Sequence, residues 1–186
     1  STLESLDIGG GLGIRYQPEA GPGMDPAALA AVVGPLAAEA GLPVTMEPGR
    51  FLVGSAGVLL TEVLYRKHSG GRDFVIVDAA MNDLLRPSLY KAHHEIVEVV
   101  PAGRPAGPVD VVGPICETGD FLARDRRLPP MAQGDLVAIF SAGAYGMSMA
   151  SNYNGVTRPA VVFVDGGSAR LVTRRETYDD LVARDM

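Results

Sequence analysis

The chain has 186 residues, of which 47% are hydrophobic and 20% charged, enough to bury the core of one large or two small domains. Its formal net charge of −6 argues against a nucleic-acid surface, which needs a basic stripe. No apolar run approaches the length of a membrane helix, and no charged-then-apolar leader is visible. The single cysteine, Cys116, cannot form an internal disulfide, which fits a reducing cytoplasm. Together with the lack of a membrane-length apolar run, this leads us to expect a cytoplasmic protein without a membrane partner.

Residues 1–50 predict strands alternating with a helix. A short strand in "LESLDI" ends in a glycine-rich loop, and a second strand in "LPVTM" runs into "EPGR". Between them, "PAALAAVVGPLAAEA" has apolar residues at helical spacing, with Asp25 and Pro26 at its start and Gly41 as its stop. Pro35 should kink this helix. Two strands separated by a helix are typical of parallel β/α units.

Residues 51–186 predict an all-β domain with a short terminal helix. The β-rich runs are "VLLTEVLYRKHS", "DFVIVDA", "HEIVEVV", "VDVVGPI", "DLVAIFSAG", "PAVVFVDG" and "ARLVTR". This pattern predicts an antiparallel barrel or sandwich. "PAGRPAGP" predicts a surface turn, and Thr177 with Asp180 predicts a capping box before the final helix "TYDDLVARD". Two β/α units cannot close a barrel, so residues 1–50 are either a small two-layer unit or a piece of a larger barrel.

The loop "DIGGGLG" places Gly9, Gly10 and Gly11 where backbone N–H groups could approach an anion closely. The dinucleotide fingerprint Gly-x-Gly-x-x-Gly is not met, because Ile14 or Tyr16 occupies its last position, and there is no P-loop. A simple tight turn is therefore an equal alternative.

"EPGR" offers a carboxylate and a guanidinium across a turn. Glu47 suits a cationic ring nitrogen, and Arg50 suits a phosphate or carboxylate. The alternative is a surface ion pair on a proline turn.

"NDLLRPSLYKAHHEI" brings Arg86 and Tyr90 close together; the alternative is a solvated arginine and a half-buried tyrosine. His93 and His94 are adjacent, so on a strand they would point to opposite faces. Because that arrangement suits a metal poorly and His68 has no obvious partner, we expect no metal site.

"GPICETGDFL" places Cys116 beside Glu117 in a polar loop. A lone cysteine is usually a small buried hydrophobe, but here it could be a proton donor or an interface residue. In "FSAGAYGMSMASNYNG", Tyr145 could give its hydroxyl to a phosphate, whereas Tyr153 suits a structural role.

Taken in order, "DIGGGLG", "EPGR", "RPSLYKAHHEI", "GPICETGD" and "SAGAYGMSMASNYN" resemble the C-terminal half of the diaminopimelate decarboxylases. Those enzymes belong to the alanine-racemase-like, fold-type III family of pyridoxal-phosphate (PLP) decarboxylases. The resemblance covers essentially the whole chain. It implies that residues 1–50 are the last two β/α units of a TIM barrel, whose final loops bind phosphate, and that residues 51–186 are the C-terminal β domain. One departure is Val156, where the family has an arginine; Arg158 and Pro159 fit.

The resemblance also implies a role for each candidate residue. The cofactor PLP would be held by Gly9, Gly10, Gly11, Glu47, Arg50 and Tyr145. The substrate would be bound by Arg50, Arg86, Tyr90, Glu117 and Tyr145. Cys116 would donate a proton after carbon dioxide leaves, and together with Glu117 it would enter the partner subunit's active site. The enzyme would therefore be an obligatory homodimer.

The reaction implied is the conversion of meso-2,6-diaminopimelate to L-lysine and carbon dioxide. The family's cofactor-bearing lysine lies upstream, and neither Lys67 nor Lys91 matches its context. We therefore expect a fragment that lacks six barrel units and the first strand of the β domain. Alone it would be inactive, and its residues 1–50 would pack poorly.

Two other interpretations remain open. One is a sister decarboxylase acting on ornithine, arginine or carboxynorspermidine. The other is a non-catalytic regulatory homologue, against which the presence of Arg86, Cys116, Glu117 and Tyr145 argues.

Overall fold

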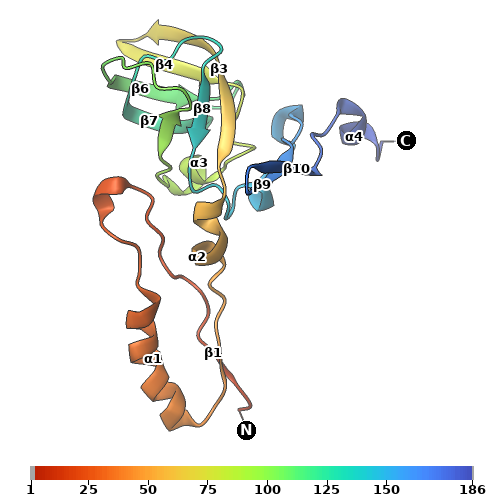
Figure 1. Ribbon diagram of the computed structural model, residues 1–186. Helices are drawn as coiled ribbons and strands as arrows, with labels where there is room; N and C mark the ends of the chain where they lie inside the picture. The colour runs from red at the N-terminus through yellow and green to blue at the C-terminus, as the bar shows by residue number, and fades with distance from the viewer. Residues whose placement is uncertain (1–2, 186) are drawn as a thin grey trace.

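The computed structural model describes residues 3–185, which form an N-terminal arm, a sheet domain and a C-terminal hairpin (Figure 1). The arm contains β1 (Leu6–Asp7), η1 (Pro18–Ala20), α1 (Pro26–Ala40), β2 (Val44–Thr45), α2 (Gly49–Val53) and η2 (Gly54–Ala56). The expected pattern is confirmed, because β1 and β2 pair in parallel. Asp25 caps α1 by accepting a hydrogen bond from the Ala27 N–H, Gly41 ends it with φ 63°, and Pro35 lies inside it.

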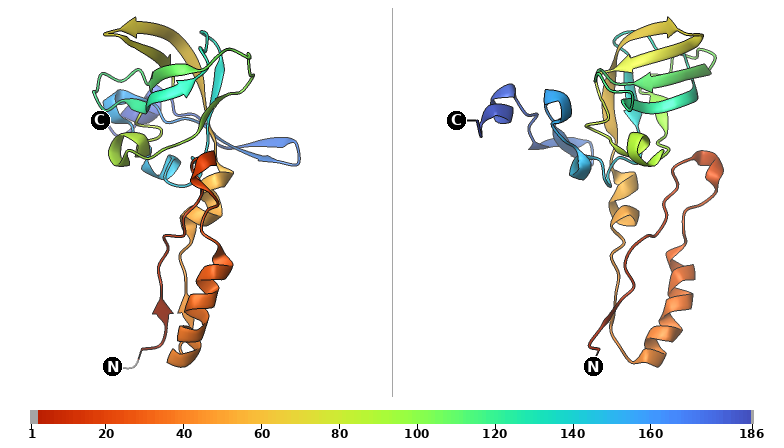
Figure 2. Two further views of the ribbon diagram at one scale, coloured as in Figure 1. Left: turned by 90° about the vertical axis from the view of Figure 1, so that its left-hand side faces the viewer. Right: turned by 180° about the vertical axis from the view of Figure 1, so that it is seen from behind.

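Helix α1 leaves its apolar side chains in solvent. None of its residues is buried, and Val32 and Leu36 are 64% and 60% exposed. Both views of Figure 2 show the arm extending away from the sheet domain, with α1 covered by no second layer of the described chain. The β/α unit therefore carries an apolar face without a partner.

The sheet domain is one nearly closed sheet of six strands in the order β5-β8-β3-β4-β6-β7. The strands are β3 (Leu59–Ser69), β4 (Arg72–Val77), β5 (Ile96–Glu98), β6 (Gly107–Val112), β7 (Phe121–Leu128) and β8 (Leu136–Ile139). Its core is built from alternating strand residues, among them Val63, Val75, Val111, Leu122 and Ile139, with Leu84 from a loop. Each fully buried side chain of this kind contributes about 1.5–3 kcal/mol.

Two features of the sheet correct the sequence-based expectation. The sheet is mixed rather than antiparallel, because β4 and β6 pair in parallel, with Phe74 opposite Asp110. Between β4 and β6 the chain runs to the opposite edge of the sheet, where β5 pairs with β8. Because of this long crossover, β6 can return beside β4 in the same direction. Strand β7 was not predicted, because its charged sequence "FLARDRRL" lacks the β-branched pattern of a strand.

The C-terminal elements lie beside the sheet domain. The hairpin of β9 (Val161–Asp165) and β10 (Ser168–Thr173) forms a separate two-stranded sheet and projects from the domain in Figure 2. Helix α4 (Tyr178–Val182) begins with the expected capping box of Thr177 and Asp180. Among residues 3–185, no helix is both long and apolar enough to cross a membrane.

Candidate functional site

The glycine loop lies directly against the turn that follows β2, because β1 and β2 are parallel neighbours. The Glu47 N–H donates to the Gly9 carbonyl (2.8 Å), and the Gly9 N–H donates to Asp7 Oδ1 (2.7 Å). A Cβ on Gly10 would lie 2.4 Å from the Glu47 carbonyl oxygen, so a side chain does not fit there. The loops predicted to hold the cofactor are therefore in contact.

Arg50 joins the same two loops at the start of α2. Its Nη2 donates to the Gly11 carbonyl (3.3 Å). Its Nε is buried, and no group in the part of the chain that the structure describes accepts a hydrogen bond from it. Buried N–H donors normally have a hydrogen-bond acceptor. The Arg50 Nε therefore suits an anionic ligand bound beside the backbone of the glycine loop.

Arg86 is the first residue of α3 (Arg86–Tyr90), and it is only 8% exposed. Its Nη1 donates to the Tyr16 hydroxyl (2.9 Å) and to His94 Nε2 (3.2 Å). Its guanidinium carbon lies 5.0 Å from the ring centroid of Tyr16 and 5.6 Å from that of Tyr145. The alternative of a solvated arginine is therefore wrong.

His94 is fully buried beside Arg86, in the loop before β5 rather than on a strand as expected. Its Nδ1 lies 2.9 Å from the Phe140 carbonyl, which only accepts hydrogen bonds. Since Arg86 only donates, the imidazole must carry its proton on Nδ1 and accept at Nε2. Burial, followed by nearby positive charges that include Arg86, lowers the His94 pKa.

The loop that carries Tyr145 docks on the end of α2. The Gly143 N–H donates to the Gly54 carbonyl (3.1 Å), and a Cβ on Gly54 would meet Arg50 Cγ at 3.6 Å and Ala144 Cβ at 3.8 Å. Tyr145 itself adopts φ 62°. The loop therefore brings Tyr145 to Arg86 while its neighbour Ala144 packs near Arg50.

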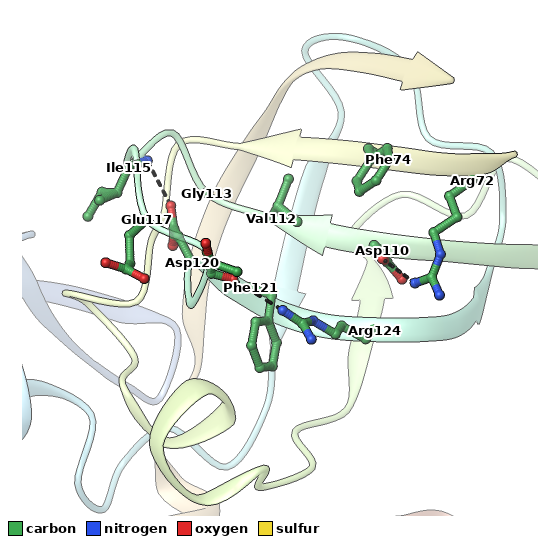
Figure 3. A pocket seen from close by; sticks show the side chains of 11 residues that line it. Arg72, Phe74, Asp110, Val112, Gly113, Ile115, Glu117, Asp120, Phe121 and Arg124 are labelled. Atoms are coloured by element: carbon green, nitrogen blue, oxygen red, sulfur yellow. Dashed lines mark hydrogen bonds and ion pairs between the residues drawn. The ribbon is translucent and has the colours of Figure 1, made fainter. Parts of the chain in front are cut away.

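Cys116 and Glu117 occupy an exposed loop between β6 and β7, held by a buried carboxylate. Asp120 Oδ2 accepts from the Ile115 N–H (2.7 Å), and Oδ1 accepts from the Met81 N–H (2.8 Å). Figure 3 shows Ile115, Glu117 and Asp120 gathered at the end of β6. Burial raises the pKa of Asp120. Cys116 is exposed, which excludes the buried-hydrophobe alternative.

Glu117 also contacts Tyr153. The Tyr153 hydroxyl donates to Glu117 Oε2 (3.3 Å), and the Gly119 N–H donates to Oε1 (3.0 Å). The negative charge of Glu117 raises the pKa of Tyr153. Tyr153 therefore orients a predicted substrate-binding carboxylate.

The predicted residues fall into separate groups. The glycine loop, Glu47 and Arg50 form one, and Arg86 with Tyr145 forms a second nearby. Within residues 3–185, no hydrogen bond or ion pair joins Cys116 or Glu117 to either group. Tyr90 is 64% exposed.

Sequence reasoning missed Tyr16 and His94. In the sequence alone, Tyr16 stands out only as a mismatch to the dinucleotide fingerprint, and His94 only as a poorly placed metal ligand. Their proximity to Arg86 depends on contacts distant in sequence. Among the residues described, no group of three or more His, Cys, Asp or Glu could hold a metal ion.

An open groove of about 370 Å³ runs along β6 and β7 (Figure 3). Arg72 and Asp110 form an ion pair across 3.2 Å in its wall. Of the predicted site residues, only Glu117 lines it.

Comparisons with known proteins show which family the chain resembles. Residues 16–143 match the family described as pyridoxal-dependent decarboxylase, C-terminal sheet domain. The diaminopimelate decarboxylase of Neisseria meningitidis serogroup A is 52% identical over 184 residues, covering 99% of this chain and 45% of that protein. The Helicobacter pylori diaminopimelate decarboxylase complexed with L-lysine is 39% identical, with a TM-score of 0.90 over 98% of this chain and 44% of that one.

A more distant relative is the lysine/ornithine decarboxylase of Vibrio vulnificus complexed with cadaverine. It is 27% identical, with a TM-score of 0.72 over 84% of this chain and 42% of that one. The chain thus spans less than half the length of these relatives. It belongs to the pyridoxal-dependent decarboxylase family, in the part that includes the C-terminal sheet domain.

Proposed function

We propose that this chain is the C-terminal part of a PLP-dependent decarboxylase that converts meso-2,6-diaminopimelate to L-lysine and carbon dioxide. The observation that carries the proposal is the environment of Arg86, which lies among Tyr16, His94 and Tyr145. A buried guanidinium with no ion-paired carboxylate in residues 3–185 suits a ligand carboxylate, and it lies near loops suited to an anionic cofactor.

The residues present fit the phosphate group of PLP at the glycine loop, Gly9–Gly11. Backbone N–H groups of Gly10 and Gly11, with the free Nε of Arg50, would bind the phosphate, while Gly9, whose N–H is engaged by Asp7, would shape the loop. Glu47 would pair with the ring nitrogen. When bound, PLP withdraws the electron pair that loss of carbon dioxide leaves on the α-carbon.

Other residues act on the substrate. Arg86 and Tyr90 would bind the carboxylate at the distal end of diaminopimelate, and Glu117 would bind the distal ammonium. Tyr145, whose ring lies beside Arg86, would contact cofactor and substrate. Arg86, Tyr90 and Glu117 would therefore favour a substrate that carries both an amino group and a carboxylate at its distal end over one, such as ornithine, that carries only an amino group there.

Cys116 would supply the proton that replaces the lost carboxylate at the α-carbon. Its exposed loop is not joined to the glycine loop within the described chain, so it would serve the site of a partner subunit. This arrangement requires a homodimer, in a cytoplasmic enzyme. The unpartnered face of α1 would pack inside the family's β/α barrel, with residues 1–50 as its last two units.

Substrate choice within the family is the main alternative. The lower identity to the lysine/ornithine decarboxylase than to diaminopimelate decarboxylases favours diaminopimelate. A regulatory homologue is disfavoured because the catalytic and substrate positions retain chemically competent side chains.

The full-length protein that contains this chain should be assayed for carbon dioxide release from meso-diaminopimelate, ornithine, arginine and carboxynorspermidine. We expect turnover of diaminopimelate, with L-lysine as product, and loss of it in Arg86→Ala. Preference for another of these substrates would change the assignment within the family. Absence of all turnover with bound PLP would favour the regulatory alternative.

A further inference from the structure

Among residues 3–185, the guanidinium of Arg86 forms hydrogen bonds only with uncharged groups. Its direct partners are the Tyr16 hydroxyl from the arm and His94 Nε2 from the loop before β5, and the two aromatic rings of these partners meet edge to face at 5.5 Å. A buried cation normally has a carboxylate beside it, because burial of an unpaired charge is costly. No carboxylate of residues 3–185 forms an ion pair with Arg86.

We propose that His94 and Tyr16 are positioning residues that aim the Arg86 guanidinium at the substrate's distal carboxylate, and that His94 must be neutral to do so. The inference rests on the proposed function, which assigns Arg86 to that carboxylate. Neither His94 nor Tyr16 needs to touch the substrate.

The tautomer of His94 follows from its two partners. The Phe140 carbonyl fixes the proton on Nδ1, which leaves the Nε2 lone pair facing Arg86. A proton on Nε2 would place an N–H against an N–H of Arg86. The hydrogen bond would be lost, and the guanidinium would be repelled.

The other groups around His94 oppose its protonation. Arg126 of β7 donates to the His94 backbone carbonyl (2.9 Å) and to His93 Nδ1 (3.1 Å). The nearby carboxylate, Glu95, is engaged with His93 at 3.2 Å and with Arg126 at 3.9 Å rather than with His94. The imidazole therefore sits among cations, and its lowered pKa agrees with this. It stays neutral at pH 7 and becomes charged only in acid.

A matched pair of substitutions separates the two hydrogen bonds of His94. In His94→Gln, the side-chain amide oxygen can reach the Nε2 position and accept from Arg86. In His94→Asn, the shorter amide can reach the Nδ1 position and donate to Phe140, but it leaves Arg86 without its acceptor. Tyr16→Phe removes the second acceptor and keeps the ring.

The measurement is the affinity of the full-length, PLP-loaded enzyme for two ligands that it should not decarboxylate. L-Lysine keeps the distal carboxylate of diaminopimelate, whereas cadaverine has no carboxylate. We expect His94→Asn and Tyr16→Phe to weaken L-lysine binding about tenfold, as for loss of a hydrogen bond to a charged group. Cadaverine binding should change less than about twofold, and His94→Gln should retain most of the L-lysine affinity.

The pH dependence gives a second readout. In the wild type, L-lysine affinity should fall in acid as His94 gains its proton, and His94→Gln should lack that part of the fall. Nitrogen-15 NMR of labelled histidine should show an unprotonated Nε2 at pH 7. Equal loss of L-lysine and cadaverine binding in the variants would reduce His94 to a structural role and overturn the inference.

The unaltered protein separates this inference from the proposed function. If it neither decarboxylates diaminopimelate nor binds L-lysine, the proposed function fails. If it does both and Tyr16→Phe and His94→Asn bind L-lysine normally, only the positioning role fails. Tyr16→Phe keeps the test decisive if substitutions at the buried His94 prevent folding.

Discussion

The hydroxyl of Tyr153 lies 3.3 Å from Oε2 of Glu117 and donates a hydrogen bond to it, which ties the loop after β8 to the loop between β6 and β7. Because Glu117 raises the Tyr153 pKa above its usual 10.0, the phenol remains a donor throughout the neutral range. Glu117 thus presents its carboxylate in one orientation.

Tyr153→Phe should therefore raise the KM for diaminopimelate several-fold in the full-length enzyme, because a hydrogen bond to a charged group is lost. Steady-state kinetics would measure it. Tyr178→Phe is the control, since Tyr178 is 76% exposed. An unchanged KM in Tyr153→Phe would mean that Glu117 does not need this partner.

Gly10→Ala should weaken PLP binding by separating the two cofactor loops. The new methyl group would lie 2.4 Å from the Glu47 carbonyl oxygen, and relief of such a clash typically costs about 1–3 kcal/mol. Titration of the apoenzyme with PLP, followed by absorbance, would measure the affinity. Gly13→Ala is the matched control, because its Cβ would meet nothing within 4 Å. Equal affinities for the two variants would contradict the close packing.

Asp83 should make the protein less stable as pH rises from about 4 to 6. Burial raises its pKa to about 6 from an ordinary value of 3.8, so the folded state binds more protons than the unfolded state in that window. Its stabilising contribution is complete below pH 3.8 and is lost as pH rises through 6. Chemical denaturation of wild type and Asp83→Asn across this range would test it; parallel pH profiles would exclude the effect.

Glu176 should hold the C-terminal hairpin in place. Its carboxylate accepts hydrogen bonds from the Arg158 guanidinium (Nε, 2.8 Å), the Arg158 backbone N–H (2.8 Å) and Asn152 Nδ2 (2.6 Å). These partners, the guanidinium above all, lower its pKa to about 2. Stability from this group is present above its ordinary pKa of 4.5 and is lost as pH falls toward 2. Glu176→Gln should accelerate tryptic cleavage around β10, whereas Glu39→Gln on α1 should not. Unchanged cleavage would show that the hairpin is held elsewhere.

The isolated chain should not decarboxylate diaminopimelate. Its two lysines, Lys67 and Lys91, are exposed, so neither is placed to hold PLP. Absorbance after PLP addition, with and without borohydride, would detect a specific covalent cofactor. Stoichiometric labelling, or formation of L-lysine, would assign that role to one of these lysines. Limited proteolysis should cut residues 1–50 first, because the apolar face of α1 is uncovered.

The sequence was sufficient for features that depend on neighbouring residues. The N-cap at Asp25, the stop at Gly41 and the capping box at Thr177 each depend on local backbone chemistry, and all three are present. The parallel pairing of β1 and β2 was likewise expected, from two strands separated by a helix.

Features that depend on distant contacts were not predictable. The Tyr16–Arg86 hydrogen bond joins residues from the arm and α3, and nothing in either local sequence indicates the other. Residue alternation likewise specifies which side of a strand is buried but not the strand's direction, so the parallel pair of β4 and β6 was missed. Strand β7 could not be predicted because its sequence is rich in charged residues and only some of its side chains are buried in the core.

The pairing of β3 with β8 has a consequence for how the protein folds. Leu59 lies opposite Ile139, so the central strand gains its second neighbour only from residues far along the chain. Contacts of such long sequence separation slow folding, because a large loop must close before they form. On the ribosome, β3 and β4 can form a hairpin early, but the sheet must wait for synthesis of β8. Until then, one edge of β3 is open to other chains, and this is the stage at which aggregation during synthesis would begin.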